Sequence, residues 1–430
     1  MMKSETSNKS SYSDFWLRLD NAAKIYPAIK DRELTSVFRV SVELKERIKA
    51  RKLVEAVHVL ENRFPYYKVR LEAGFFWYYL EHANLPITVK ADKDIPCRAF
   101  NKKELMFRIV VKENRLSVEF SHILTDGTGA FEFLKSLLSA YFERCGVDLP
   151  AGLPDNSPDK PIPEEYEDAY QRYFRKNAAP LIKGPKAFHL RFPLSPKPRF
   201  SVLTGIIPLD EIIKKAKTYE VSLTEYLIAV YLFALQDIYN RMPGFGKKRS
   251  RKTVRIEVPV NLRKMYPSKT MRNFTLYVLP WIDLRLGYYT FEEIVKTVYH
   301  QMQLETDKKL INKMISRNVS GEKNLFLRSV PLFIKSLVLS RLYSLGTSQY
   351  SGVITNLGKV SFTPRINQLI NRFVFIPPPP NKTLKTNCGV VGFDNKLVIS
   401  FGSITTSKEL ERCFFTFITG QGIPVKIEKY

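Results

Sequence analysis

The chain has 430 residues, 44% of them hydrophobic, and carries 68 Lys and Arg against 42 Asp and Glu, a net charge of +26. This composition excludes a disordered protein and suffices for two packed cores, since one core rarely organises more than about 250–300 residues. The excess of positive charge fits an anionic partner, which includes nucleic acid, an anionic membrane surface or a phosphorylated small molecule.

The cysteines and the apolar stretches exclude several classes of protein. The four cysteines are far apart and form neither a Cys-x-x-Cys pair nor a zinc-ligand pattern with histidines: Cys97, Cys145, Cys388 and Cys413. The polar N-terminal residues lack the apolar stretch of a signal peptide. Residues 329–345 form the longest apolar stretch, but Lys335 and Arg341 interrupt it. We therefore expect a cytoplasmic protein with no transmembrane segment and no metal site.

The first third of the chain predicts a complete mixed unit. Residues 46–64 have apolar residues at helical spacing, and the spacing places His58 on the packed face with Val54. A buried helix is predicted from Ala130 onward. Short segments rich in β-branched and aromatic residues predict strands, and the last two straddle a Lys-Glu-Asn turn typical of a hairpin: residues 67–82, 105–112 and 115–122.

A proline-rich, charged stretch near the middle of the chain predicts a linker between two units. We divide the chain into an N-terminal unit (residues 1–150), a crossover linker (151–198) and a C-terminal unit (199–430). In the second unit, Ser222 and Glu225 form a capping box before a strongly apolar helix. The predicted strands of this unit are residues 200–209, 254–264 and 272–284, with a hairpin at 388–404, and its predicted helices are 209–220, 221–239 and 291–308.

Residues 117–129, SVEFSHILTDGTG, place one of only five histidines between a strand and a glycine-containing turn. Side chains alternate along a strand, so His122 points to the apolar side. Gly127 and Gly129 permit backbone angles that other residues resist and bring the turn close to whatever lies opposite. Asp126 can accept hydrogen bonds from its own backbone or from an arginine. Two interpretations remain open: a general base held by a shaped turn, or a buried histidine beside a turn-forming aspartate.

His122, Asp126 and Gly127 within FSHILTDGTGA resemble the His-x-x-x-Asp-Gly signature of the CoA-dependent acyltransferase superfamily, which includes chloramphenicol acetyltransferase, alcohol acetyltransferases, BAHD enzymes and peptide condensation domains. Downstream, VPVNLRKMYPSKTMRNF and ITNLGKV resemble segments of its bacterial alcohol acetyltransferase-like branch. The resemblance implies an α/β fold in which two chloramphenicol-acetyltransferase-like units form a V-shaped pseudo-dimer with a tunnel between them, and His122 at the tunnel's midpoint.

The activity implied by the resemblance is transfer of an acyl group from acyl-CoA, with acetyl-CoA preferred, to an alcohol hydroxyl in a direct ternary complex. His122 would be the general base. Asp126 would be structural and paired with Arg263. Thr355 or Asn356 would stabilise the oxyanion or bind substrate, although a turn-forming role for Asn356 is equally open. Acyl-CoA would be a co-substrate, with no permanently bound cofactor.

Two departures from the family patterns narrow this expectation. Ser121 stands before His122, where condensation domains commonly have a second histidine, and the Asp-Phe-Gly-Trp-Gly box of the BAHD branch is absent. Both favour a stand-alone monomer that uses free acyl-CoA. Two alternatives stay open: a condensation-type enzyme that transfers acyl from a carrier-protein thioester to an amine, and a noncatalytic protein that binds an anionic ligand.

The densest basic run, GKKRSRKTVR, also has two interpretations. Lys247, Lys248 and Arg249 are candidates to contact the phosphates of CoA. The alternative is a solvated loop. The partners we expect are acyl-CoA and a small alcohol or amine acceptor, while nucleic acid is disfavoured and peripheral contact with a membrane is compatible with the charge.

Overall fold

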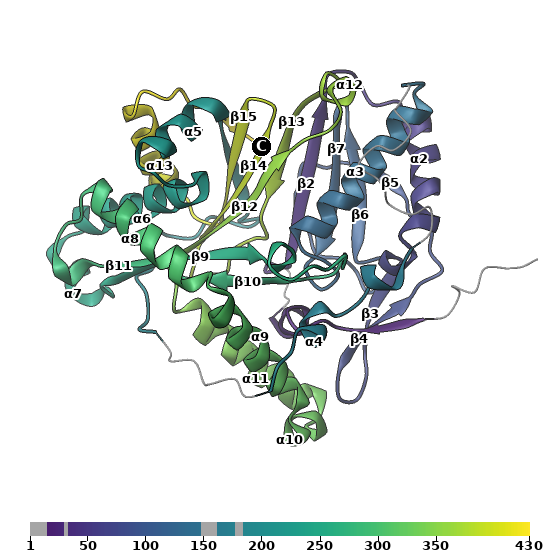
Figure 1. Ribbon diagram of the computed structural model, residues 1–430, viewed down its shortest axis with the longest axis horizontal. Helices are drawn as coiled ribbons and strands as arrows, with labels where there is room; N and C mark the ends of the chain where they lie inside the picture. The colour runs from purple at the N-terminus through teal and green to yellow at the C-terminus, as the bar shows by residue number, and fades with distance from the viewer. Residues whose placement is uncertain (1–14, 30–32, 148–160, 177–183) are drawn as a thin grey trace, which may run out of the picture.

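The computed structural model describes residues 15–29, 33–147, 161–176 and 184–430. Its elements form two α/β lobes side by side, the first in purple and blue and the second from teal to yellow (Figure 1). The expected mixed α/β class with two lobes is therefore confirmed. Each lobe has a central sheet, and its helices cover that sheet on the outside.

The first lobe contains a five-stranded sheet in the order β13-β2-β7-β6-β5 and a three-stranded sheet in the order β1-β4-β3. Helices α2 and α3 pack against each other beside the larger sheet (Figure 1). The strands are β1 (Trp16–Arg18), β2 (Val37–Leu44), β3 (Val69–Ala73), β4 (Tyr78–His82), β5 (Val89–Ala91), β6 (Phe107–Lys112), β7 (Arg115–Ser121) and β13 (Ile370–Ile376). The helices are α1 (Tyr26–Ile29), α2 (Ala50–Arg63) and α3 (Gly127–Arg144).

The second lobe contains an eight-stranded sheet in the order β10-β9-β12-β14-β15-β8-β16, with β11 paired to β9. Its strands are β8 (Ser201–Pro208), β9 (Thr253–Asn261), β10 (Thr275–Val278), β11 (Trp281–Asp283), β12 (Gly352–Val360), β14 (Thr386–Phe393), β15 (Lys396–Ser403) and β16 (Lys426–Lys429). Its helices are α5 (Leu209–Thr218), α6 (Leu223–Arg241), α7 (Gly244–Arg249), α8 (Phe291–Glu305) and α13 (Glu409–Gly420). The remaining helices are α4 (Ala169–Arg172), α9 (Lys308–Lys323), α10 (Leu325–Ser329), α11 (Leu332–Thr347) and α12 (Pro364–Asn367).

Several local expectations hold and others are wrong. The hairpin of β6 and β7 and the capping box of α6 are confirmed. The placement of Val54 and His58 is wrong, because α2 buries a stripe that includes Leu53 and Val57 and leaves these two exposed. The strand expected over 67–82 is two antiparallel strands, β3 and β4. The strand expected over 272–284 is two strands, because Pro280 lies in the gap and has no N–H to donate to a sheet.

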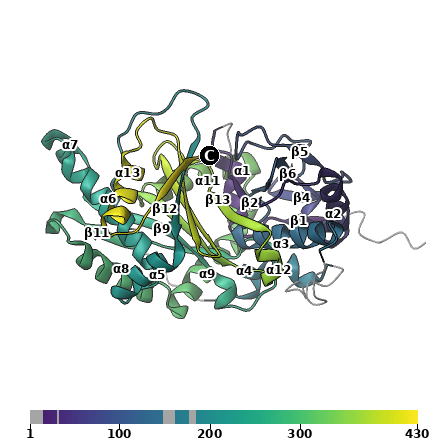
Figure 2. The same ribbon diagram turned by 90° about the horizontal axis from the view of Figure 1, so that it is seen from above.

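One strand of the first lobe comes from the far end of the chain. β13 pairs antiparallel with β2, so the sheet of the N-terminal unit is completed by residues expected in the C-terminal unit (Figure 2). Residues expected in the linker also enter a core, since Phe188 and Leu190 are buried in the second lobe. The lobes are therefore joined by shared packing as well as by the chain.

Replacement of Phe373 tests how much the packing of β13 in the first lobe contributes to stability. The side chain is 1% exposed, and its ring contacts Phe131 of α3 and Phe393 of β14. We expect Phe373→Ala to lower the free energy of unfolding by about 3–5 kcal/mol, through lost burial and a cavity. Phe245 on α7 is 74% exposed, so Phe245→Ala should change it by no more than about 0.5 kcal/mol. Urea denaturation monitored by circular dichroism measures both, and equal effects would contradict a shared core at β13.

Candidate active site

His122 directly follows β7 and borders the space between the lobes. Its backbone N–H donates to the Ser36 carbonyl (2.9 Å), and its own carbonyl accepts from Asn273 Nδ2 (2.9 Å). The imidazole lies between two aromatic rings, with centroid distances of 5.3 Å to Tyr26 and 4.6 Å to Phe38. Both the backbone and the ring of His122 are therefore fixed in position.

The aromatic surroundings of His122 set its protonation state. Burial lowers its pKa from 6.5 to about 4, because the imidazolium form loses hydration between two rings. The charge of Asp126 and hydrogen bonding with Asn273 and the Thr125 backbone act in the opposite direction without reversing the shift. At neutral pH the ring is uncharged and can accept a proton. It is not sealed off, since it lines a cavity that a substrate can occupy.

Asp126 is the N-cap of α3, and four donors occupy its carboxylate. Oδ1 accepts from the backbone N–H groups of Thr128 (3.1 Å) and Gly129 (3.2 Å). Oδ2 accepts from Arg263 Nη1 (2.8 Å) and from the Phe274 N–H (2.9 Å). The ion pair expected with Arg263 is thus present. The carboxylate holds the turn in place and connects the first lobe to the second.

Arg263 also fixes the segment that crosses from the second lobe to the first. Its Nε donates to the Thr270 carbonyl (3.0 Å), and its Nη2 donates to the Arg272 carbonyl. Between these residues, the Met271 carbonyl accepts from the hydroxyl of Thr125 in the His122 turn. We call residues 270–274 the clamp. Through the clamp, the second lobe holds the backbone of the turn that carries the histidine.

The two glycines of the turn provide space rather than unusual backbone angles, which corrects the sequence-based expectation. Neither Gly127 nor Gly129 has a positive φ. A Cβ on Gly127 would lie 2.6 Å from Leu357 Cδ2, and one on Gly129 would lie 2.3 Å from the Met271 carbonyl oxygen. Leu357 and Met271 both belong to the second lobe, so the glycines allow the two lobes to approach at the turn.

A cavity of about 730 Å³ lies between the lobes, and His122 and Asp126 are in its wall. The first lobe contributes α1 and the start of α3, and the second contributes parts of β9, β12 and α11. Many lining side chains are apolar or aromatic, among them Ile29, Phe131, Leu276, Leu342, Leu357 and Phe375. Three lysines also line it, and so do three acidic residues: Lys135, Lys264, Lys359, Asp126, Glu132 and Glu257. The cavity suits an extended ligand with an apolar part and a few polar groups.

Thr355 and Asn356 lie on β12 and line this cavity, but their side chains differ in availability. Asn356 Oδ1 accepts from the Gly358 N–H (2.9 Å), and its Nδ2 donates to Thr224 Oγ1 (3.0 Å). These bonds match the turn-forming interpretation of Asn356. Within the described part of the chain, the hydroxyl of Thr355 has no hydrogen-bond partner, so it is the better placed of the two to meet a substrate.

The structure adds Glu257, which the sequence analysis did not identify. Glu257 is on β9 and lines the cavity together with Pro259 and Asn261, which share its strand face. Burial raises its pKa to about 7, although a hydrogen bond with Tyr350 opposes the shift. The available signal was an acidic residue in a strand segment that is apolar except for it and Arg255, VRIEVPV.

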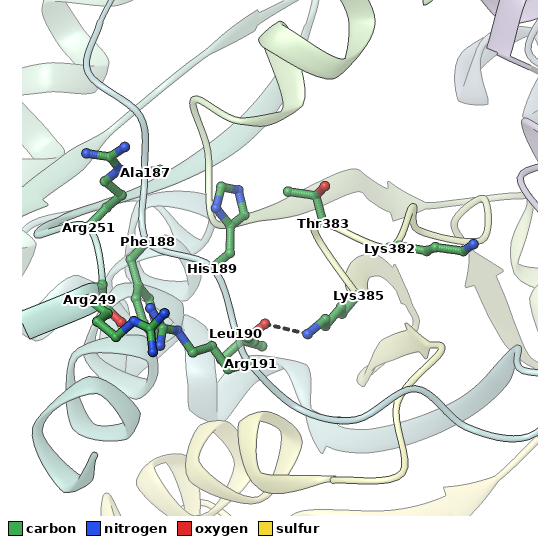
Figure 3. Close-up of a pocket in the computed structure, with 11 residues that line it drawn as sticks. Ala187, Phe188, His189, Leu190, Arg191, Arg249, Arg251, Lys382, Thr383 and Lys385 are labelled. Atoms are coloured by element: carbon green, nitrogen blue, oxygen red, sulfur yellow. Dashed lines mark hydrogen bonds between the residues drawn. The ribbon is translucent and has the colours of Figure 1, made fainter. Parts of the chain in front are cut away.

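The residues of the basic run lie in different surroundings in the structure. Arg249 lines a second hollow of about 410 Å³, whereas Lys247 and Lys248 line neither this hollow nor the cavity. Figure 3 shows the residues around it, which include five cationic side chains: Arg191, Arg249, Arg251, Lys382 and Lys385. Among the residues that the structure describes, none of the five forms an ion pair with an acidic side chain. We call this hollow the basic pocket.

The basic pocket and the cavity share a wall. Asn381 and Leu384 line the cavity, while Lys382 and Lys385, in the same loop, line the basic pocket. On the other side, the His189 ring in the basic pocket is bonded to the carbonyl of Thr347, which lines the cavity (Nε2 to O, 3.2 Å). The two hollows are therefore neighbours, separated by residues 381–385 and by the contact of His189 with Thr347.

No group of three or more His, Cys, Asp and Glu side chains gathers as a metal site within residues 15–29, 33–147, 161–176 and 184–430.

Comparison with known proteins identifies the fold. No protein-family model and no curated protein sequence matches the chain. Among solved structures, a trichothecene 15-O-acetyltransferase from Fusarium sporotrichioides is similar with a TM-score of 0.60 at 9% identity, covering 96% of both chains. The first condensation domain of the calcium-dependent antibiotic synthetase gives 0.59 at 14% identity, over 93% of this chain and 94% of that one. A protein of F. graminearum, in complex with coenzyme A and T-2 mycotoxin, gives 0.58 at 9% identity, over 93% and 96%.

Removal of Arg263 tests the link between turn and clamp. The side chains of Arg263 and Asp126 are 12% and 3% exposed, so Arg263→Ala leaves a buried carboxylate without its cation. We expect a loss of about 3–5 kcal/mol in the free energy of unfolding. Arg285 forms an ion pair with Asp283 but is 69% exposed, and Arg285→Ala should cost no more than about 1 kcal/mol. Chemical denaturation compares the variants, and a mild effect at both sites would show that the turn does not depend on Arg263.

Proposed function

We propose that this chain, which has the two-lobed fold of CoA-dependent acyltransferases and condensation domains, transfers an acyl group from a thioester to a hydroxyl group, with His122 as the general base. The observation that carries the proposal is an uncharged imidazole fixed at the wall of a cavity between the lobes. The structural neighbour in complex with coenzyme A supports acyl-CoA as the donor. The motif segments favour the alcohol acetyltransferase-like branch and an acetyl donor.

The reaction proceeds in a ternary complex without an acyl-enzyme. The acceptor hydroxyl donates a hydrogen bond to the His122 imidazole, which removes its proton as the oxygen attacks the thioester carbonyl. The tetrahedral intermediate then collapses, the C–S bond breaks, and the departing CoA thiolate takes the proton from the imidazolium. The low pKa of His122 keeps the resting ring uncharged and lets the transient imidazolium readily return its proton, while it lowers the driving force for removing the proton from the hydroxyl.

The other site residues have separate roles in this proposal. Asp126 and Arg263 are positioning residues that keep the His122 turn against the clamp, and Gly127 makes room for Leu357. The Thr355 hydroxyl is the candidate donor to the oxyanion, because nothing in the described residues engages it. Asn356 keeps β12 and the neighbouring turn in shape.

Glu257 provides a polar subsite within the cavity. With its pKa raised to about 7 and Tyr350 as its partner, it can donate or accept a hydrogen bond near neutral pH. A hydroxyl of the acceptor suits this carboxyl, and so does an amine. The condensation-type alternative, transfer from a carrier-protein thioester to an amine, follows from the likeness to a condensation domain. Rates with free acyl-CoA and with an acylated carrier protein, each measured with alcohol and amine acceptors, separate the two functions.

The basic pocket is proposed to hold the phosphate groups of CoA. Its five cations without acidic partners favour a multiply charged anion, and its place beside the cavity suits a long donor whose phosphates lie apart from its thioester. Arg249 therefore keeps its proposed role, joined by Arg191, Arg251 and Lys382. Lys247 and Lys248 lie outside the pocket and on helix α7, so the basic run is not the solvated loop of the alternative interpretation.

Replacing His122 tests the general base. Loss of proton removal should reduce kcat with acyl-CoA and an alcohol about 10²- to 10⁴-fold in His122→Ala, with little change in KM for the donor. The exposed His58 provides the control, and His58→Ala should keep full activity. In the wild type, kcat/KM should stay level as pH falls through 6.5 and decline only towards about 4, since protonation of the imidazole abolishes catalysis. Release of free thiol reports the rate, and unchanged activity in His122→Ala would remove His122 from the mechanism.

A charge comparison within the basic run tests the phosphate site. Arg249→Ala combined with Arg251→Ala should raise KM for acyl-CoA about 10-fold or more, because charge-assisted hydrogen bonds to phosphate are lost. Lys247→Ala combined with Lys248→Ala removes the same charge from the same run outside the pocket and should leave KM within about twofold. Equal effects of the two pairs would indicate a general attraction of charge instead of a site. An acyl-pantetheine donor without phosphates should respond to neither pair.

A further inference from the structure

Helix α11 exposes its apolar side chains and buries polar ones. Phe333, Leu337 and Leu345 are 69%, 69% and 50% exposed, whereas Lys335 and Thr347 are buried. The exposed apolar positions recur every three or four residues and form one stripe along the helix: Phe333, Ile334, Leu337, Val338, Leu342 and Leu345. A helix of a globular protein normally has the opposite arrangement. Helices α10 and α11 lie at the lower end of the molecule in Figure 1.

The stripe continues onto two neighbouring elements. The turn between β3 and β4 presents Phe75, which is 73% exposed, beside the start of α11, where the Leu332 N–H donates to the Phe75 carbonyl (2.9 Å). Lys335 Nζ donates to the carbonyls of Phe76 and Arg328 (both 3.0 Å), which ties the turn and α10 to α11. Phe326 on α10 is 87% exposed. We call this continuous surface of α10, α11 and the β3–β4 turn the apolar face.

The charge around the apolar face is positive. Helices α10 and α11 carry exposed Arg328 and Arg341 and contain no aspartate or glutamate. Arg341 stands within the stripe, because it follows Leu337 by four residues and precedes Leu345 by four. The nearest preceding acidic residue, Glu322, is ion-paired with Lys24. The apolar face therefore carries positive charge that no acidic side chain of these two helices offsets.

We infer that the apolar face docks on the surface of an anionic lipid membrane. Exposed Leu and Phe side chains can enter the boundary between headgroups and acyl chains, while Arg328 and Arg341 attract anionic headgroups, and each effect strengthens the other. Insertion across the bilayer is not implied. In the described residues no single helix is long and apolar enough to cross a membrane, and the pair α5 and α6, which passes by length and composition together, is bent by 81°.

Docking would place the cavity next to the membrane. Leu342, Tyr343 and Gly346 of α11 line the cavity, so one helix forms part of both its wall and the apolar face. A substrate dissolved in the bilayer would then reach His122 along α11 without crossing water. This step, which rests on the proposed function, points to a lipophilic acceptor or acyl chain. The docking itself depends only on the apolar face and its charge.

Vesicle flotation tests the docking. Wild-type protein should float with phosphatidylcholine vesicles that contain phosphatidylserine and should float poorly with phosphatidylcholine alone. Phe333→Ser combined with Leu337→Ser should weaken binding about 100-fold, because two large apolar contacts are lost. Phe245 and Ile427 are also exposed but lie on α7 and β16, so Phe245→Ser combined with Ile427→Ser is the matched control and should bind as the wild type does.

The results of these experiments distinguish a membrane from a second copy of the chain as the partner of the apolar face. Absence of binding to anionic vesicles, or equal losses in both variant pairs, would overturn the inference. A wild-type dimer that becomes monomeric in Phe333→Ser with Leu337→Ser, measured by light scattering, would assign the face to a second copy instead. Thiol release with a water-soluble alcohol should be the same in this variant and the wild type, because neither side chain lines the cavity. The membrane-docking inference and the proposed acyl transfer can therefore be contradicted separately.

Discussion

The carboxylate of Asp126 is the contact on which the site depends. It caps α3 through Thr128 and Gly129, pairs with Arg263, and accepts the N–H of Phe274, so one side chain joins a helix start, a cation and the crossing clamp. A buried carboxylate is stable only when such donors surround it. Because the donors come from both lobes, the position of His122 four residues earlier depends on how the lobes pack. The site therefore requires the folded pair of lobes.

The environment of His122 shows why the neighbouring carboxylate does not act on it as it would in a charge-paired histidine. Asp126 raises the pKa of the imidazole, but its oxygens are directed to backbone N–H groups and to Arg263, and burial beside the rings of Tyr26 and Phe38 outweighs its charge. The result is an uncharged ring rather than an imidazolium–carboxylate pair. Such a ring can accept a proton at neutral pH and returns it readily within one turnover, and it is a weaker base than an imidazole of ordinary pKa.

Local structure was predictable from the sequence, whereas contacts between distant parts of the chain mostly were not. The hairpin before His122 and the capping box of α6 depend on neighbouring residues and were predictable from spacing. The pairing of Asp126 with Arg263 came from a motif resemblance, since no local pattern joins residues 137 positions apart. The insertion of β13 beside β2 and the place of Glu257 in the cavity wall had no such support, because both are set by tertiary packing.

Residues 329–345 show the limit of reading charge along a chain. Lys335 and Arg341 interrupt an apolar run, and for a spanning helix that interruption is decisive. In the fold, however, Lys335 turns inward, where its ammonium group donates to two backbone carbonyls and lies 3.7 Å from the centre of the Trp77 ring. One of the two charges that exclude a spanning helix is thus removed from the outer surface, and what remains outside is a mainly apolar face that carries the exposed Arg341. A segment unsuited to crossing a bilayer is for this reason well suited to resting on one.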